Sequence, residues 1–230
     1  MNILVVAAHP DDEILGCGGT MARRACEGDD VYIAILGEGI TSRSPKRHMA
    51  DPKAIKKLHE RSRAAARIVG AKEVFLSGLP DNRFDSVDLL DVIKIVEGLV
   101  ERLRPPVVYT HHPGDLNLDH GVVARAVLTA TRPVQGHPVR ELYAFEVPSS
   151  TEWAFQRIEP LFRANFFVDI SATLDVKLKA MAQYEGESRP FPHPRSNEAL
   201  RAIAQRWGSV AGCKAAEAFE LMRAISGVKG

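Results

Sequence analysis

The sequence has few cysteines, little net charge and no long apolar run, and each of these shortages narrows the class of protein. Its three cysteines, Cys17, Cys26 and Cys213, form no CxxC pair and no framework of a secreted disulfide-rich domain. A formal net charge of +1 gives no reason to expect nucleic acid or an anionic membrane as a partner. The opening run MNILVVAA lacks a basic flank and is far shorter than the ~20 residues that span a bilayer. We therefore expect a cytoplasmic protein without a transmembrane segment.

The length and composition indicate one ordinary globular domain. The chain has 230 residues, of which 45% are hydrophobic and 26% charged. This is enough to bury a core without disulfides. We find no internal repeat and no low-complexity linker, so the prediction is a single domain over residues 1–230.

Short apolar runs alternate with longer amphipathic stretches over the first 130 or so residues. The runs predict strands at 3–8, 31–36, 74–76 and 107–110. The stretches predict helices at 15–27, 52–69, 87–103 and after His120. Strand–helix alternation of this kind is typical of a doubly wound, Rossmann-like α/β fold, with a mostly parallel sheet flanked by helices.

The pattern after about Pro133 is less regular. Residues 141–147 and 165–170 suit strands, and residues 175–184 suit a helix. We also predict a helix over 197–225, broken near Gly208 or Gly212.

Histidines and carboxylates follow two of the predicted strands. The first strand runs into His9-Pro10-Asp11-Asp12-Glu13, and the fourth into the segment 111–120, which reads HHPGDLNLDH. Ligands of open α/β sheets bind at the carboxyl ends of the strands, where these two loops would meet if their strands are near neighbours. Convergent imidazoles and carboxylates suit a cation such as zinc, although each loop taken alone could be a solvated turn.

At this point the sequence resembles a known family, the PIG-L (LmbE-like) N-acetylsugar deacetylases. The resemblance rests on AHPDDE at residues 8–13, on the GCGGT that follows, and on DLNLDH ending at His120. It implies hydrolysis of the acetamide of an N-acetylated amino sugar at a zinc ion, with iron(II) as the other metal that the ligands suit. We expect a small-molecule substrate, and self-association because related enzymes often self-associate.

The resemblance also implies roles for individual residues. His9, Asp12 and His120 would bind the metal, and Asp11 would be the general base. Asp119 would orient a neighbouring imidazole by a hydrogen bond. His111 and His112 are rival ligands that rank below His120, because the family pattern places the metal on the histidine of the Asp-His pair.

One departure from the family concerns the general acid. Several members have a histidine two residues before the aspartate of that pair, whereas this chain has Asn117, which can donate a hydrogen bond to an oxyanion but cannot be the acid. Either Asp11 returns its proton to the leaving amine, or another histidine supplies it. His193, which lies between two prolines, is our candidate replacement.

Polar residues in other loops are candidates for substrate contacts. Arg43 follows the second strand and Asp85 follows the third, so both would lie at the same edge of the sheet as the metal. Together with Asn117 and Arg195 they could bind sugar hydroxyls, and arginine could also bind a phosphate.

Two other functions remain open from the residues alone. A metal-dependent phosphoesterase would also place aspartate and histidine at strand ends, but it usually has a second metal cluster or a nucleophilic aspartate, and neither is evident. A catalytically inactive sugar-binding protein of the same fold would have no need of a free Asp11. The sequence does not specify the sugar.

Overall fold

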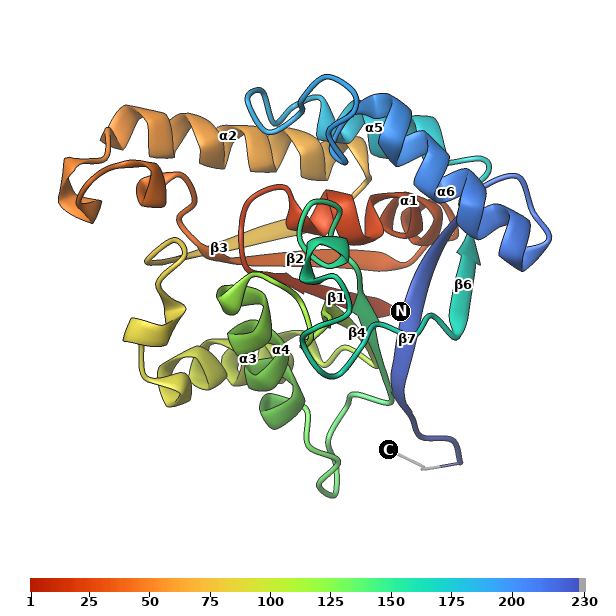
Figure 1. The fold of residues 1–230 in the computed structure, drawn as a ribbon. Helices are drawn as coiled ribbons and strands as arrows, with labels where there is room; N and C mark the ends of the chain where they lie inside the picture. Colours follow the sequence, from red (N-terminus) through yellow and green to blue (C-terminus); the bar gives the residue numbers. More distant parts are fainter. Residues whose placement is uncertain (228–230) are drawn as a thin grey trace.

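A seven-stranded, mostly parallel sheet forms the centre of the molecule, and helices cover both of its faces (Figure 1). The structure is a computed structural model that describes residues 1–227. Its strands are β1 (Asn2–Ala7), β2 (Asp30–Gly37), β3 (Glu73–Leu79), β4 (Val107–His111), β5 (Glu141–Phe145), β6 (Phe166–Asp169) and β7 (Ala216–Ala224). Their order is β3-β2-β1-β4-β5-β7-β6. The first five strands in the chain pair in parallel, whereas β7 is antiparallel to both β5 and β6. The predicted doubly wound, mostly parallel sheet is therefore confirmed.

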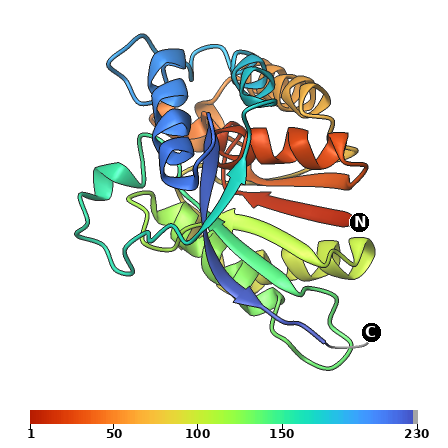
Figure 2. The same cartoon turned by 90° about the vertical axis from the view of Figure 1, so that its right-hand side faces the viewer.

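The helices cover the sheet in two layers (Figures 1 and 2). They are α1 (Asp12–Cys26), α2 (Pro52–Ile68), α3 (Leu89–Leu103), α4 (Leu118–Ala130), α5 (Leu174–Met181) and α6 (Asn197–Ala211). Single 3-10 turns lie at η1 (Thr41–Arg43), η2 (Arg47–Met49), η3 (Phe84–Ser86) and η4 (Glu152–Ala154). Helices α3 and α4 cover one face, and α1, α2, α5 and α6 lie on the other.

Strand β1 shows why both faces of the sheet are covered by helices. Ile3 and Val5 are buried in the core beneath α1, α2, α5 and α6, and the alternate residues Leu4 and Val6 are buried in the core beneath α3 and α4. Successive side chains of a strand point to opposite faces, so an uninterrupted apolar run requires a helical layer on each side.

Helix α1 begins earlier than the sequence predicts and packs unusually close to the sheet. It begins at Asp12 rather than at residue 15, directly after Asp11, whose φ is 107°. Cys17 has non-helical backbone angles, so the helix is kinked there. A Cβ atom built on Gly16 would lie 2.3 Å from Cδ2 of Phe145, so the glycine allows α1 to approach β5.

The prediction of a helix over 197–225 is wrong in its second part. Helix α6 ends at Ala211, and Gly212 has a φ of 77°, which ends a helix at little conformational cost. Residues 216–224 then form β7, which fills the space between β5 and β6. Glu217 on this strand is buried and accepts hydrogen bonds from Lys177 and from the backbone of α1.

The fourth helix is also earlier than predicted. It begins at Leu118 and not after His120, because the side chain of Asn117 accepts a hydrogen bond from the backbone N–H of Asp119 and caps the first turn. His120 is therefore held on a helix rather than on a loop.

The strand order brings the two predicted loops together. Strand β1 lies between β2 and β4, so the direction of winding reverses between β1 and β4. The loops after these two strands carry His9 and His120. Cys17, Cys26 and Cys213 are free thiols, and none of the helices within residues 1–227 could cross a membrane.

Candidate active site

A polar cavity of about 180 Å³ opens where the loops after β1 and β4 meet. Its walls come from residues far apart in the chain, in the ranges 9–12, 39–43, 81–82, 117–120, 149–150 and 187–195. Most of these segments follow the carboxyl ends of strands, so the topology of the sheet places the cavity.

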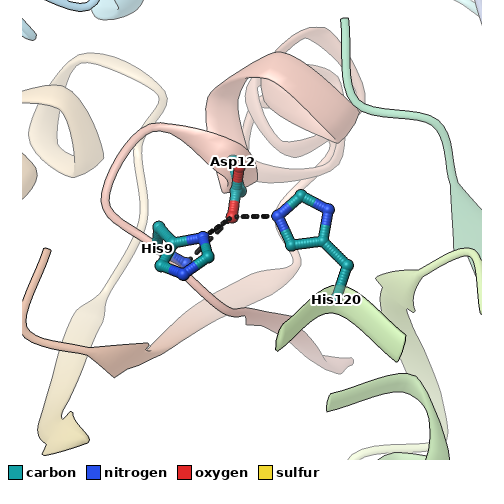
Figure 3. Close-up of side chains that lie close together, drawn as sticks. All are labelled: His9, Asp12 and His120. Carbon is teal, nitrogen blue, oxygen red and sulfur yellow. Dashed lines mark hydrogen bonds and ion pairs between the residues drawn. The ribbon is translucent and has the colours of Figure 1, made fainter. Parts of the chain in front are cut away.

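His9, Asp12 and His120 converge beside this cavity (Figure 3). Nδ1 of His9 and Nε2 of His120 each lie 3.2 Å from Oδ2 of Asp12, and one donor atom from each residue lies within 4.8 Å of the others. Three atoms this close together can bind one cation.

The donor atoms of this cluster fit a divalent cation. Nε2 of His120 is buried and makes no hydrogen bond within residues 1–227, which suits a nitrogen whose lone pair binds a metal. Two imidazoles and one carboxylate with an open side toward the cavity are a ligand set of catalytic zinc and also suit iron(II).

A carboxylate fixes each of the two imidazoles from behind. Nε2 of His9 lies 2.9 Å from Oδ2 of Asp119, whose Oδ1 accepts a hydrogen bond from the backbone of Phe84. Nδ1 of His120 lies 3.1 Å from Oδ1 of Asp115. Each contact directs the opposite ring nitrogen toward Asp12, which is the usual arrangement around metal-binding histidines.

The charges of this buried cluster attract a cation. Burial alone would lower the pKa of His120, but Asp12 and Asp115 outweigh it and raise the pKa to about 9. For His9 burial is likewise outweighed by Asp119 and Asp12, and its pKa rises to about 10. A site that favours protons on two imidazoles in this way also favours a bound cation in their place.

Asp12 is held in its charged form. Burial would raise the pKa of Asp12, yet His120 and His9 beside it hold that pKa well below its usual range. The backbone N–H of His9 also donates a hydrogen bond of 2.9 Å to its Oδ2. Asp12 is therefore an ionised carboxylate available to a cation.

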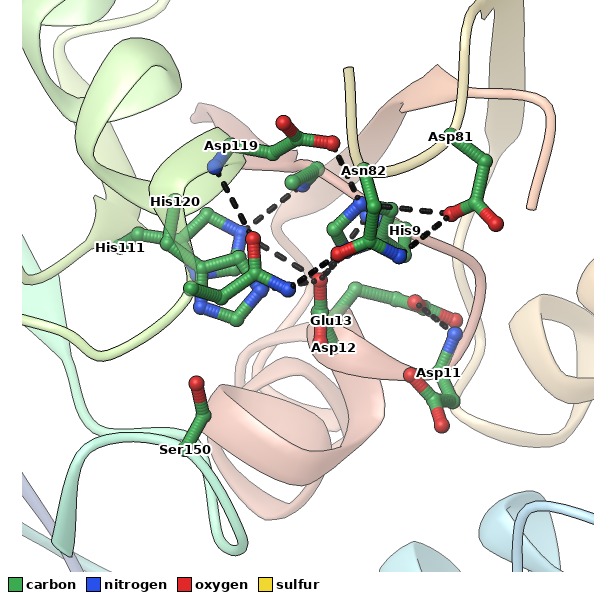
Figure 4. A network of polar contacts seen from close by, with 12 residues as sticks. His9, Asp11, Asp12, Glu13, Asp81, Asn82, His111, Asp119, His120 and Ser150 are labelled. Carbon is green, nitrogen blue, oxygen red and sulfur yellow. Dashed lines mark hydrogen bonds and ion pairs between the residues drawn. The ribbon is translucent and has the colours of Figure 1, made fainter. Parts of the chain in front are cut away.

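Asp11 lies in the same cavity, with its carboxylate pointing in a different direction from that of Asp12 (Figure 4). It is 2% exposed, and burial raises its pKa well above the usual range although the nearby Arg195 opposes this. Nη1 of Arg195 lies 2.6 Å from Oδ2 of Asp11. Asp11 is thus a buried carboxylate next to the candidate metal ligands but outside the cluster, where it can accept a proton.

His111 and His112 are engaged elsewhere. Nε2 of His111 accepts a hydrogen bond of 2.8 Å from the backbone N–H of Ala8, so this lone pair is taken. Nε2 of His112 lies 3.2 Å from Glu220, on β7. The geometry therefore favours His120 over both rivals.

The predicted substrate contacts and the candidate general acid, His193, fall into two groups. Arg43, Asn117 and Arg195 line the cavity. Asp85 is exposed on η3 and His193 packs against Trp153, and neither residue is part of the cavity wall. The structure brings the first group to the candidate metal centre and leaves the second outside.

Several residues of the site carry no role in the sequence analysis. Asp115 accepts hydrogen bonds from the hydroxyls of Ser150 and Thr151, and with His120 these contacts overcome burial and lower its pKa to about 2. Asp81 and Glu187 contribute carboxylates to the cavity wall. Asp115 could have been predicted to belong to the site, because it lies in the loop after β4. Nothing in the sequence pattern places Ser150 or Glu187 at the carboxyl edge of the sheet.

The protein is thus an α/β protein with a candidate metal centre where the direction of winding reverses between β1 and β4. A second carboxylate, that of Asp11, lies beside this centre without belonging to it. The model of the PIG-L family, described as GlcNAc-PI de-N-acetylase, matches residues 4–131, which is more than half of the chain. The chain belongs to this family.

Two relatives that are named as deacetylases match much of the chain. The chain is 32% identical over 154 residues to the uncharacterized deacetylase YaiS of Escherichia coli, covering 65% of this chain and 75% of the relative. It is 24% identical over 244 residues to the diacetylchitobiose deacetylase of Thermococcus kodakarensis, covering 97% and 84%.

A solved structure shows that the fold alone does not fix the reaction. GalB of Pseudomonas putida, a 4-carboxy-2-hydroxymuconate hydratase, superposes with a TM-score of 0.78 at 22% identity, covering 100% of this chain and 99% of that one. One architecture can serve different reactions, so the activity has to be argued from the site.

Proposed function

We propose that this chain is a metal-dependent hydrolase that removes the acetyl group from an N-acetylated amino sugar of the N-acetylglucosamine type. The observation that carries the proposal is the pairing of a His9–Asp12–His120 cluster with a separate carboxylate, Asp11, in one cavity. A binding protein would need the cluster at most, whereas hydrolysis needs both the cluster and the base.

His9, Asp12 and His120 would hold the cation, which we propose to be zinc, with iron(II) as the alternative. When bound, such a cation polarises the acetamide carbonyl and lowers the pKa of a nearby water molecule toward ~7. Asp119 and Asp115 keep the two imidazoles in the orientation that this binding requires.

Asp11 is the proposed general base. It accepts one proton from the attacking water as the new C–O bond forms at the acetyl carbon. It then gives this proton to the amine nitrogen as the C–N bond breaks, which releases acetate and the free amino sugar. Among the residues of the cavity wall the only histidines are His9 and His120, both proposed ligands, so Asp11 is the simplest donor for the amine.

The remaining polar residues of the wall are proposed to bind the substrate. One Nδ2 hydrogen of Asn117 is donated to Oδ1 of Asn82 at 2.9 Å, and the other is available to the acetamide oxygen. Arg43, with the carboxylates of Asp81 and Glu187, offers donors and acceptors to sugar hydroxyls.

The test is acetate release from a panel of N-acetyl sugars, disaccharides and nucleotide sugars by the zinc-loaded protein and its Asp11→Asn variant. We expect release by the parent and a loss of about 10²–10⁴-fold in kcat for the variant, because the base is lost while the metal ligands remain. Equal zinc content in both proteins is the control.

The panel should include a phosphate ester and 4-carboxy-2-hydroxymuconate. No acetate from any sugar, together with phosphate release or water addition, would replace deacetylation by phosphoesterase or hydratase activity. Binding of sugars without any turnover would leave the inactive sugar-binding protein.

A further inference from the structure

The carboxylate of Asp11 has no local support. Asp11 occupies the residue before α1, yet its side chain makes no capping hydrogen bond to that helix. Its backbone N–H donates to Oε2 of Glu13 at 3.0 Å, which fixes the backbone but not the carboxylate. A φ of 107° is unfavourable for a residue other than glycine, and backbone strain of this kind is typical of functional positions.

Arg195 provides the missing support from a distant part of the chain. Its Nη1 donates to Oδ2 of Asp11 at 2.6 Å, while Oδ1 accepts no hydrogen bond within residues 1–227. Nε of Arg195 donates to Oγ of Ser149 at 2.7 Å. One oxygen of the proposed base is therefore fixed, and the other remains available to a proton.

The backbone around Arg195 is itself well held. Its N–H donates to Nδ1 of His193 at 3.1 Å, and the next residue, Ser196, caps α6 through the backbone N–H of Ala199. The side chain is 20% exposed, compared with 56% for the neighbouring Arg43. The rotamer freedom that a free arginine side chain has is thus largely lost before any substrate binds.

We propose that Arg195 is a positioning residue, which holds Oδ2 of Asp11 so that Oδ1 faces the proton to be transferred, and is not primarily a substrate contact. This inference rests on the proposed deacetylase function only for its kinetic consequence. Its structural consequence, the orientation of Asp11, is independent of any activity.

The structural test is the crystal structure of the Arg195→Gln variant beside that of the parent. We expect the Asp11 carboxylate to leave its orientation in the variant while His9, Asp12 and His120 stay in place and bind zinc as in the parent. An Asp11 side chain in the same rotamer in both crystals would overturn the proposal, whatever substrate the enzyme takes.

The kinetic test separates positioning from binding. With the best substrate of the acetate-release panel, we expect Arg195→Gln to lower kcat about 10–100-fold with little change in KM, as is usual for residues that orient a catalytic group. Arg195→Lys, and guanidinium added to Arg195→Ala, should restore part of kcat. A raised KM at parental kcat would assign Arg195 to substrate binding and overturn the proposal.

Arg201→Gln is the matched control. Arg201 lies six residues further along, on α6, and pairs at 2.8 Å with the exposed Asp175, outside the cavity. The Arg201→Gln variant should have the same kcat, KM and zinc content as the parent. If the parent releases no acetate, the proposed function fails, and the orientation of Asp11 in the two crystals still decides the role of Arg195.

Discussion

The two parts of the chain on either side of residue 131 contribute differently to the site. Residues 2–130 contain every proposed metal ligand and the proposed base, on strand–helix units of a regular kind. Residues 131–227 contribute an antiparallel strand, two wall segments and the side chains that hold the first part in place, such as Ser150 and Arg195. The proposed metal ligands and base thus all lie in the first part, and the second part contributes Ser149, Ser150, Glu187 and Arg195 to the cavity wall.

This division matches what the family comparison covers. The matched region ends at residue 131, within a residue of the end of α4. The matched region therefore contains the whole candidate metal centre, whereas Ser150 and Arg195 lie beyond it.

The largest effect is expected for Asp115, whose carboxylate connects the two parts of the chain. Asp115 contacts His120 from the first part and the hydroxyls of Ser150 and Thr151 from the second. Asp115→Asn should lower zinc affinity or kcat about 10–100-fold, because the imidazole of His120 loses its charged partner. Zinc competition with a chelator and acetate release measure the two effects.

Asp119→Asn is the matched variant within the first part. The carboxylate of Asp119 supports His9 and accepts one other hydrogen bond within residues 1–227, from the backbone of Phe84. We expect this variant to lower zinc affinity or kcat by a similar factor, and Ser150→Ala to lower the same quantity by a smaller factor. Parental zinc affinity and kcat in Asp115→Asn would show that the second part does not support the metal centre.

A second test concerns packing between the two parts. Gly16 on α1 faces the ring of Phe145 on β5, with room for no Cβ atom, whereas a Cβ on Gly98 in α3 would meet nothing within 4 Å. Gly16→Ala should lower the free energy of unfolding by about 1–3 kcal/mol, because the core must yield to the added methyl. Gly98→Ala should raise it by about 0.5–1 kcal/mol, since alanine in a helix loses less backbone entropy on folding.

Denaturant midpoints at unchanged m-value measure both changes. Shifts of the same sign in the two variants would contradict the close approach of α1 to the sheet as the reason for glycine at residue 16.

The sequence predicted the first part better than the second for a physical reason. A strand buried on both faces is a continuous apolar run, and its helices are amphipathic, so β1, β2 and β4 were predicted within a residue or so of their bounds. Strand β7 contains Glu217 and Glu220, and the partners of Glu217 are the backbone of α1 and Lys177, which no local pattern reveals. Likewise, His9 and His120 follow predicted strands, but Asp115–Ser150 and Asp11–Arg195 are contacts across 35 and 184 residues.

The smallest expected effect belongs to His193, the candidate general acid of the second part. Its ring packs against Trp153 with 5.7 Å between ring centroids, its Nδ1 accepts the N–H of Arg195, and it is not part of the cavity wall. Partial burial and the neighbouring arginines lower its pKa, which disfavours the protonated imidazole that a general acid requires. His193→Ala should therefore change kcat by no more than about twofold, as for substitutions away from a site. A tenfold fall in kcat at unchanged KM would instead require the segment 191–195 to move over the cavity during the reaction, and the second part would then take part in the chemistry itself.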